Sequence, residues 1–528
     1  MPEQALPFPL PVVPPKFTPE NVGAQNRKLA QQLYAQFFSW PIERSRKILE
    51  TTPAEVWERE GQKRALKVFH AAAERVPAYK DFLKKHRVQH EKVRMIMDFK
   101  KVVPVMDKEN YLRKYELPDL CWDGVLASTQ ITSVSSGSTG EPFFWPRGAL
   151  LEVETTFLFE LILSRFFKAR AEPTLFVNSQ TMGMYIGGPF TLNALLRIAQ
   201  KGWPITVVTP GITLEDALQV LTRLRSLYRR IILAAYPPFA KDILDAGIAR
   251  GIHWSAVPMK LMLFGEGFSE TWRDYVAELS GARSAAEDFI NCYGTADAAI
   301  LAHETPYSVL LRRIFAANAP LSQKVFSDER LPSLMQYYPT FRYFELLDGE
   351  LGFTFGTGGI PLVRYNIHDR GGFLSASSSK VLWRENGGTE KSAATINLPL
   401  LYLLGRANFT TTLYGLNIYP ENIKAALERA EIQKLVTGKF QMSTEYRRRN
   451  QNQYLLINIE LARRTRPSTR LRREVRRVIV DTLKRVNAEY RKLHESVGRR
   501  AVPEIRVRAW GDLRYFTVGT KQKWVRRK

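Results

Sequence analysis

The sequence predicts an α/β fold with a doubly wound sheet and more than one domain, and one observation carries each of these predictions. From Pro173 onward, short apolar runs alternate with amphipathic segments. The runs expected to form strands are Thr174 to Val177, Ile205 to Val208, Ile231 to Ala235, Lys260 to Phe264 and Phe289 to Tyr293. Strands that alternate with helices predict a parallel sheet, whose ligands lie at the loops leaving the carboxyl ends of its strands. In addition, 528 residues exceed one ordinary hydrophobic core, so we expect two or three domains.

The chain is expected to have three parts. Six prolines among the first 15 residues prevent a stable helix, so residues 1–25 are predicted to be a flexible, proline-rich leader. A mostly helical stretch from Ala30 to Tyr115 opens a large N-terminal domain with doubly wound mixed sheets and helices, residues 26–404. After Leu404 the sequence pattern changes, and short segments expected to form strands and helices follow one another closely. Residues 405–528 are therefore predicted to form a small α+β C-terminal domain.

The C-terminal domain has two recognisable elements. Residues from Tyr454 to Ile459 alternate as a strand does, and one long amphipathic helix is predicted between Leu471 and Leu493. This helix is strongly basic. Residues 405–528 hold 30 lysines and arginines against 11 acidic residues, which gives +19 of the net charge of +25. Such a field attracts anionic partners, and charge alone leaves open whether they are cofactor phosphates, acidic carrier proteins, nucleic acid or membrane surfaces.

Several protein classes are excluded by what the sequence lacks. Two cysteines, Cys121 and Cys292, form neither a disulfide framework nor a four-cysteine zinc site. No apolar stretch reaches the roughly 18 to 20 residues of a membrane span. We therefore expect a soluble protein of the reducing cytoplasm. The motifs of P-loop enzymes, H-E-x-x-H metalloproteases and G-x-S-x-G hydrolases are also absent.

Five short segments stand out in the sequence, and the first three have compositions that suit nucleotide chemistry. They are Ser135 to Pro142, Asn291 to Asp297, Pro361 to Asp369, Gly405 to Asn408, and Thr520 to Val525. The first is rich in serine and glycine, whose backbone approaches phosphates closely. In the second an aromatic ring that can stack on a base precedes a carboxylate that can hold Mg²⁺. The third is an apolar strand ending in an aspartate that can bind the ribose hydroxyls. Each segment alone is weak evidence.

In their order and wide spacing, these five segments resemble the adenylate-forming (AMP-binding) enzyme superfamily. The closest resemblance is to the phenylacetate-coenzyme A ligase branch, through the double serine before Gly137, the pair Gly265-Glu266 and the run Pro361 to Tyr365. The resemblance extends from about residue 60 to the C-terminus. It implies a large adenylation domain joined by a hinge to a mobile C-terminal domain.

The resemblance also implies a role for particular residues. Lys521 and Asp297 are implied as catalytic, with Asp297 holding Mg²⁺. Nucleotide contacts are implied for Ser136, Gly137, Ser138, Thr139, Gly140, Gly265, Glu266, Tyr293, Gly294, Thr295, Asp369 and Arg406. Asn408 is implied at the hinge, and Phe143, Tyr236 and Gly267 in the acyl pocket. The implied cofactors and substrates are ATP, Mg²⁺ and coenzyme A.

Four residues depart from the pattern of the family. Glu141 stands where lysine is common, Asp297 where glutamate is usual, His368 where glycine is usual, and Asn408 where the hinge usually has aspartate. Asp297 keeps a carboxylate that can bind magnesium, although its side chain is one methylene shorter. These departures are expected to affect the efficiency and the reaction partner more than nucleotide binding.

The expected function is ATP-dependent activation of a carboxylic acid to an acyl-adenylate, followed by transfer to coenzyme A. Two alternatives stay open. The acceptor could be an amine or a carrier protein, or the chain could be a catalytically weakened scaffold whose basic C-terminal domain binds nucleic acid or anionic lipid. The sequence does not identify the carboxylic acid, and it leaves a homodimer open.

Overall fold

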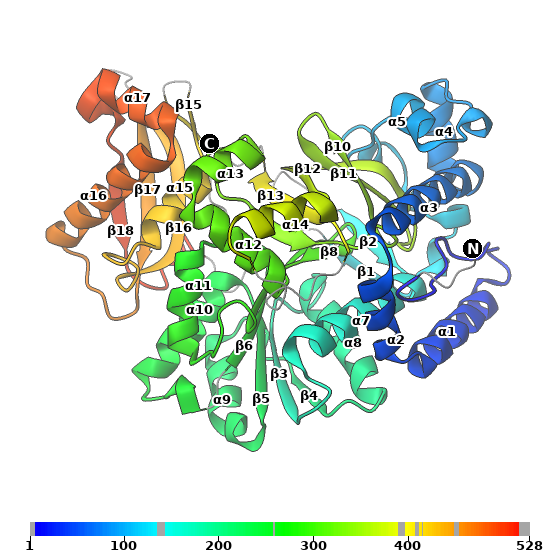
Figure 1. Cartoon of the computed structure of the whole chain (residues 1–528), viewed down its shortest axis with the longest axis horizontal. Helices are drawn as coiled ribbons and strands as arrows, with labels where there is room; N and C mark the ends of the chain where they lie inside the picture. The colour runs from blue at the N-terminus through cyan, green and yellow to red at the C-terminus, as the bar shows by residue number, and fades with distance from the viewer. Residues whose placement is uncertain are drawn as a thin grey trace.

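The computed structural model describes residues 6–134, 143–256, 259–388, 397–406, 411–413, 416–447 and 453–516. Within these residues the fold is mixed α/β, which confirms the predicted class (Figure 1). No helix of the described residues is long and apolar enough to cross a membrane. Helices of the N-terminal quarter lie on one side of the molecule in Figure 1, and the small C-terminal sheet lies on the opposite side.

One large sheet of eleven described strands organises the body of the protein, in the order β10-β11-β12-β13-β9-β8-β7-β6-β5-β3-β4. Its parallel part consists of β3 (Thr174–Ser179), β4 (Ile205–Val208), β5 (Arg230–Ala235), β6 (Met259–Phe264) and β7 (Phe289–Thr295). All five predicted strands are therefore confirmed. The antiparallel part consists of β8 (Ala299–His303), β9 (Ser333–Gln336), β10 (Tyr343–Leu347), β11 (Glu350–Phe355), β12 (Leu362–Leu374) and β13 (Leu400–Arg406).

Helices cover both faces of the parallel strands, because successive side chains of a strand point to opposite faces. In β5, Ile231 and Leu233 pack in one apolar cluster with α9 (Leu214–Leu224), α10 (Pro237–Ala249) and α11 (Glu270–Ser280). Ile232 and Ala234 belong to a second cluster with α7 (Ala149–Ile162) and α8 (Gly187–Gln200). Beside the antiparallel strands lie α12 (Pro306–Ala317), α13 (Ala319–Phe326) and α14 (Ala376–Glu385).

The N-terminal segment packs against the body, in contrast to the flexible leader expected from its prolines. Phe8, Leu10 and Phe17 are buried in the same cluster as α7. Prolines hold the segment extended, so side chains elsewhere satisfy its carbonyl groups. Arg75 donates to the carbonyls of Pro14 and Pro15, both at 2.8 Å. The helices that receive the segment include α1 (Val22–Ser39), α2 (Ile42–Thr51) and α3 (Ala54–Arg75).

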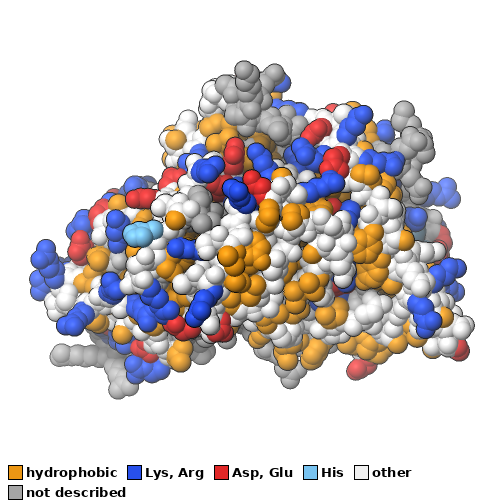
Figure 2. All heavy atoms as spheres, turned by 90° about the horizontal axis from the view of Figure 1, so that it is seen from below, with side chains coloured by type: hydrophobic (Ala, Val, Ile, Leu, Met, Phe, Trp, Pro, Cys, Tyr) orange, Lys and Arg blue, Asp and Glu red, His pale blue; other side chains and the backbone are white. Residues whose placement is uncertain are grey.

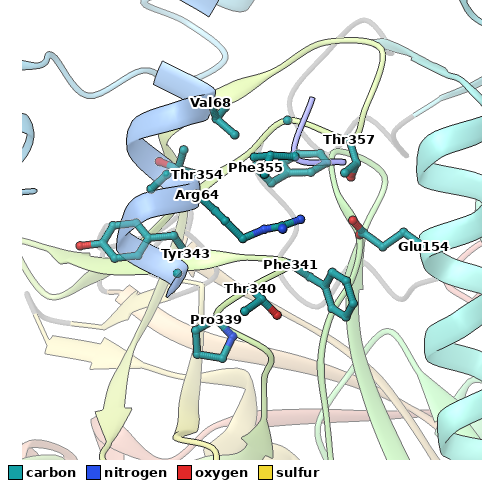
Figure 3. Close-up of a pocket in the computed structure, with 14 residues that line it drawn as sticks. Arg64, Val68, Glu154, Pro339, Thr340, Phe341, Tyr343, Thr354, Phe355 and Thr357 are labelled. Carbon is teal, nitrogen blue, oxygen red and sulfur yellow. The ribbon is translucent and has the colours of Figure 1, made fainter. Parts of the chain in front are cut away.

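Val12 of the N-terminal segment also lines a small cavity between α3 and α7, which polar and apolar side chains surround (Figure 3). Arg64 crosses this cavity toward Glu154 and donates to the carbonyl oxygen of Leu10 at 3.0 Å. Glu154 is fully buried and lies 2.5 Å from the guanidinium of Arg342. The hydroxyls of Thr340 and Thr357 line the same cavity without a hydrogen-bond partner. A water molecule bridging these groups would satisfy them, so we interpret the cavity as structural.

The C-terminal residues form a separate lobe with its own apolar cluster. Its strands are β14 (Thr411–Leu413), β15 (Leu416–Ile418), β16 (Val436–Tyr446), β17 (Gln453–Leu461) and β18 (Glu504–Arg508). Its helices are α15 (Pro420–Leu427), α16 (Thr469–Val486) and α17 (Ala488–Val497). The strand predicted at Tyr454 is confirmed as β17. The single long helix predicted from Leu471 is wrong, because Asn487 interrupts it: its backbone is extended and its side chain caps α17 by accepting from Tyr490 N at 2.9 Å.

Ion pairs and a hydrogen bond join the C-terminal lobe to the body. The ammonium of Lys439 in β16 lies 2.7 Å from the carboxylate of Asp242 in α10, and both side chains are buried. Lys424 in α15 lies 3.3 Å from Glu266, and Arg464 donates to the carbonyl of Ala249 at 2.8 Å. Separation of a buried pair such as Lys439–Asp242 would leave each charge uncompensated, which is costly. This contact therefore holds the lobe in its present orientation.

His303 in β8 predicts a pH-dependent stability. Its Nδ1 lies 2.7 Å from the carbonyl oxygen of Glu304 and its Nε2 lies 2.9 Å from the hydroxyl of Tyr338, so the neutral ring is satisfied in the core. Burial lowers the pKa of His303 from 6.5 to about 4. The unfolded chain therefore binds a proton more readily, and we expect roughly 3 kcal/mol of stability to be lost as the pH falls from 6.5 to 4. Urea unfolding across this range measures the loss.

Acidic groups elsewhere also titrate in this range, so the control is His303→Gln, which carries no titrating ring. The free energy of unfolding of the variant should fall less steeply with acid than that of the unmodified protein. Parallel pH curves for the two proteins would contradict the assignment.

Candidate functional site

Two of the candidate segments meet through one buried hydrogen bond. Tyr293 lies in β7 and Asp369 in β12, and the phenol oxygen of Tyr293 donates to Oδ2 of Asp369 at 2.6 Å. Both residues are buried, with 8% and 5% of their surface exposed. The aromatic residue and the carboxylate that were expected to hold a nucleoside are therefore side by side, although 76 residues separate them in sequence.

Arg406 belongs to the same location through the backbone of the sheet. In the antiparallel ladder of β12 and β13, Arg406 lies directly opposite Asp369. Directly opposed residues of an antiparallel pair have their Cα atoms about 4.5 to 5.5 Å apart. The residues expected to fix a ribose thus come from neighbouring positions on adjacent strands.

Asp297 follows β7 and is held by Tyr365, to which the sequence analysis gave no role, and by Lys108, which it did not single out. The phenol of Tyr365 donates to Oδ2 of Asp297 at 2.7 Å, and the ammonium of Lys108 lies 3.6 Å from Oδ1. The carboxylate side chain is only 7% exposed, whereas that of Lys108 is 31% exposed. An ammonium and a carboxylate at this distance attract one another, so Lys108 is a cation of the candidate site.

Lys108 reaches Asp297 because its segment pairs with the backbone of β12. Met106 N donates to the carbonyl of Arg364 at 3.3 Å, and Asn366 N donates to the carbonyl of Met106 at 2.9 Å. The ammonium of Lys108 also lies 5.5 Å from the centre of the Trp145 ring in β2 (Phe144–Arg147). No local pattern marks this lysine, because only the long-range pairing places it.

His368, which stands where the family usually has glycine, has a left-handed backbone with φ of 61°. Glycine adopts this conformation without strain, whereas a side chain costs about 1 to 2 kcal/mol. The imidazole has partners that offset this cost. Its Nδ1 lies 2.8 Å from a carboxylate oxygen of Glu350, and its Nε2 lies 3.5 Å from Asp107, the residue before Lys108. The departure is therefore compatible with the same local fold.

The segment after β6 is shaped by close packing at its glycines. Gly265 has φ of 90°, and a Cβ atom there would lie 2.4 Å from the ring of Tyr236. A Cβ atom on Gly267 would lie 2.9 Å from the hydroxyl of Ser333.

Burial and the nearby carboxylate of Glu266 raise the pKa of Tyr236 to about 12, so its phenol is protonated at neutral pH. Glu266 is tied to β7, since Asn291 Nδ2 donates to its carbonyl at 3.0 Å.

Three further residues were expected at the site: Gly294 and Thr295 at the end of β7, and Phe143 just before β2. Thr295 Oγ1 accepts from Ala298 N at 3.2 Å, and Gly294 packs so tightly that a Cβ atom would lie 2.9 Å from the carbonyl of Ala299. Phe143 contacts Trp145, with 4.7 Å between ring centres. Trp145 in turn contacts Tyr365 at 6.4 Å, so Phe143 is connected to the Asp297 side of the site.

Several expected residues lie outside the described residues. They are Ser136, Gly137, Ser138, Thr139, Gly140, Glu141, Asn408 and Lys521. The phosphate loop, the hinge residue and the catalytic lysine therefore stay predictions from the sequence.

The two cysteines have the environments of core residues. Both Cys121 and Cys292 are buried and free of disulfides. Burial raises the pKa of Cys121 to about 12 and that of Cys292 well above its usual value. Neither thiol is therefore poised to act as a nucleophile.

Comparison with known proteins identifies the fold. No protein-family model and no curated protein matches the sequence. Among solved structures, 2-hydroxyisobutyryl-CoA ligase in the postadenylation state with its acyl-AMP is similar, with a TM-score of 0.63, 16% identity and 91% of each chain covered. The same ligase in the thioesterification state with CoA gives a TM-score of 0.51, 16% identity and coverage of 90% of this chain and 91% of that one.

A different kind of synthetase has the same fold. An acyl acid amido synthetase gives a TM-score of 0.50, 16% identity and coverage of 94% of this chain and 90% of the other. The chain therefore has the fold of adenylate-forming enzymes over almost its whole length. The comparisons do not single out the phenylacetate-coenzyme A ligase branch.

Proposed function

We propose that this protein uses ATP to activate a carboxylic acid as an acyl-adenylate. The observation that carries the proposal is the 2.6 Å hydrogen bond between Tyr293 and Asp369, which joins the expected adenine and ribose residues of the resemblance in one buried site. Adenylation also agrees with the fold. A second support is the backbone register that sets Arg406 opposite Asp369.

The reaction follows from what these residues can do. A carboxylate is already ionised at neutral pH, and one of its oxygens attacks the α-phosphorus of ATP. The new acyl–phosphate bond forms as the bond to the β-phosphate oxygen breaks, and pyrophosphate leaves with the electron pair. Tyr293 stacks on the base, Asp369 and Arg406 bind the ribose, and the loop from Ser136 to Gly140 binds the phosphates.

Asp297 has the chemistry of a magnesium ligand. Mg²⁺ in nucleotide sites is commonly bound by one or two carboxylates together with substrate phosphates and water. Asp297 supplies one buried carboxylate, and Tyr365 orients it by donating to Oδ2. The fit is therefore adequate. The ion, when bound, neutralises charge on the phosphate oxygens.

Lys108 adds a cation to this part of the site, and its removal should be measurable. In the complex with ATP its ammonium is proposed to turn from Asp297 toward the phosphates, which carry more negative charge. Replacement of Lys108 by alanine is then expected to slow ATP–pyrophosphate exchange about tenfold at low ATP, the effect of one partly exposed charge-assisted contact of about 1.4 kcal/mol.

Lys101→Ala is the matched control for Lys108→Ala. Lys101 is exposed in the same N-terminal region, and its replacement removes the same charge. It should leave the exchange rate unchanged. Equal rates for Lys108→Ala and the unmodified protein would remove Lys108 from the site.

Coenzyme A is the acceptor that we propose for the second step, with the thiol attacking the acyl carbon and AMP leaving. The 2-hydroxyisobutyryl-CoA ligase structure holds CoA, but the amido synthetase has a nearly equal TM-score. An amine acceptor is therefore the second candidate. AMP release that requires coenzyme A, and not an amine, would distinguish the two.

The acyl group is proposed to bind near Phe143, Tyr236 and Gly267. The apolar surroundings suit an aromatic or medium-chain acid. We also propose that residues 26–404 act as the adenylation domain and residues 405–528 as the mobile domain, with the hinge near Asn408.

Screening carboxylic acids for acid-dependent ATP–pyrophosphate exchange tests the proposal. Exchange supported by one class of acid is the expected result. Absence of exchange with every acid, while ATP still binds, would contradict adenylation and favour the scaffold alternative.

A further inference from the structure

The solvent-facing side of α16 carries several exposed arginines. Leu471, Val475, Val478, Ile479 and Leu483 are buried against the C-terminal lobe, which leaves the opposite side of the helix in solvent. Four exposed side chains within two turns define what we call the arginine face: Arg470, Arg472, Arg473 and Arg476. Positions 470 to 476 span about 9 Å along the axis of the helix, so the four arginines lie close together near its N-terminal end.

The positive charge of this face is not neutralised by the described part of the chain. Its four arginines make no ion pair there, and the neighbouring Arg477 has one weak contact, 3.5 Å from Asp481. By contrast, Lys439 and Lys424 of the same lobe are paired with acidic residues of the body. Blue side chains are also dense on the lobe at the left of Figure 2. The arginine face is therefore free to attract an anion.

The type of basic residue indicates phosphate as the partner chemistry. Residues 405–528 contain 22 arginines and 8 lysines. A guanidinium binds a phosphate through two parallel hydrogen bonds and stacks on aromatic rings, which an ammonium does less well. Elsewhere on the lobe, Arg463 lies 5.0 Å from the ring centre of Trp510, which is 36% exposed, and Arg508 lies 4.0 Å from that of Tyr515.

The same face lacks the apolar anchors of a typical protein interface or of a helix that inserts into a membrane. Protein interfaces place large apolar or aromatic anchors at their centre, and membrane-surface helices insert an apolar face. No large hydrophobic side chain is exposed on α16, which is described in full. A cluster of guanidinium groups without apolar anchors is instead typical of contacts to a nucleic-acid backbone. Nearby aromatic rings can add stacking on bases, which does not depend on the base sequence.

We propose that the arginine face of α16 binds the phosphate backbone of nucleic acid, without sequence preference. The interaction is independent of the ligase chemistry proposed above, since none of these arginines belongs to the candidate site.

The test measures binding of a labelled single-stranded RNA of about 20 nucleotides to the full chain between about 50 and 300 mM potassium chloride. The variant R470Q/R472Q/R473Q/R476Q removes the face while keeping good helix formers. The matched control is R27Q/R46Q/R59Q/R94Q, which removes four exposed arginines from the N-terminal region and changes the net charge equally. Circular dichroism confirms that both variants are folded.

The expected result is a loss of at least tenfold in affinity for the α16 variant at about 100 mM salt, and a slope of log K against log salt that is smaller by about 3, since four phosphate contacts are lost. The control should stay within about twofold of the unmodified protein. Equal losses in the two variants would assign binding to net charge and overturn the proposal, as would unchanged binding by the α16 variant. Tighter binding to polyglutamate or to phosphatidylserine vesicles would overturn it in favour of a protein or a membrane partner.

Discussion

Replacement of Asp369 by alanine is expected to weaken ATP binding about a thousandfold while leaving the protein folded. In the proposed complex the carboxylate accepts hydrogen bonds from both ribose hydroxyls. Hydrogen bonds to a charged group contribute about 1.5 to 3 kcal/mol each, and two of them account for a loss of this size. Isothermal titration with ATP measures the affinity directly, without knowledge of the carboxylic acid.

Tyr293→Phe separates the role of the carboxylate from that of its neighbour. The phenol donates to Asp369 at 2.6 Å, so phenylalanine removes this hydrogen bond but keeps the aromatic ring. The variant should lose less affinity than Asp369→Ala, because the ring still stacks and the carboxylate still binds ribose. Unchanged ATP affinity in Asp369→Ala, with unfolding by urea also unchanged, would refute the ribose assignment.

The parallel half of the sheet could be predicted from local sequence because each strand is a nearly continuous apolar run. β3 and β5 to β7 are buried between helices on both faces, and this burial requires such runs. The antiparallel half lacks this signal. β12 contains Arg364 and His368 with left-handed backbones, and its partner β13 is reached only after the segment that includes α14.

The candidate site was predictable only in part. Asp297 follows β7, but Tyr293 lies within β7, and β12 continues five residues beyond Asp369, where the sequence indicated the end of a strand. The pairing of the strands in one sheet brings these residues into one region. Lys108 and Tyr365 could not be assigned to Asp297 from sequence, since a contact between residues so distant depends on the packing of the segment at Met106. A capped break in a helix is equally hard to foresee, because apolar spacing continues on both sides of Asn487.

The proline-rich N-terminus shows the limit of composition as a guide. Prolines do exclude a helix over residues 6–17, as expected. Disorder does not follow, because Phe8, Leu10 and Phe17 bury enough apolar surface to order the segment once a groove accepts them. The prolines therefore predict that the segment is not helical, and the apolar surface that buries Phe8, Leu10 and Phe17 decides whether it is ordered.

Replacement of Lys521 by alanine is the sharpest test of the proposed mechanism, because a catalytic lysine and a merely exposed lysine predict very different effects on adenylation. Lys521 lies outside the described residues, so its role rests on the resemblance of Thr520 to Val525. A lysine that only solubilises the terminus should be dispensable. If it contacts the α-phosphate and the attacking carboxylate, its loss should slow adenylation by about a hundred- to a thousandfold, the effect of removing one donor of roughly 3 to 4 kcal/mol from the transition state.

Two comparisons decide whether Lys521 acts as a positioned cation. Lys523→Ala removes the same charge two residues further on and should have little effect on pyrophosphate exchange. An equal loss from both variants would indicate general charge. The second comparison uses a pre-formed acyl-AMP with coenzyme A, because the resemblance implies that the lysine serves only the first half-reaction. Lys521→Ala should leave this step nearly intact, since in the proposed mechanism the C-terminal domain turns about its hinge and withdraws the lysine before the thiol enters. A variant equally slow in both half-reactions would refute the two-state mechanism even if ligase activity were established.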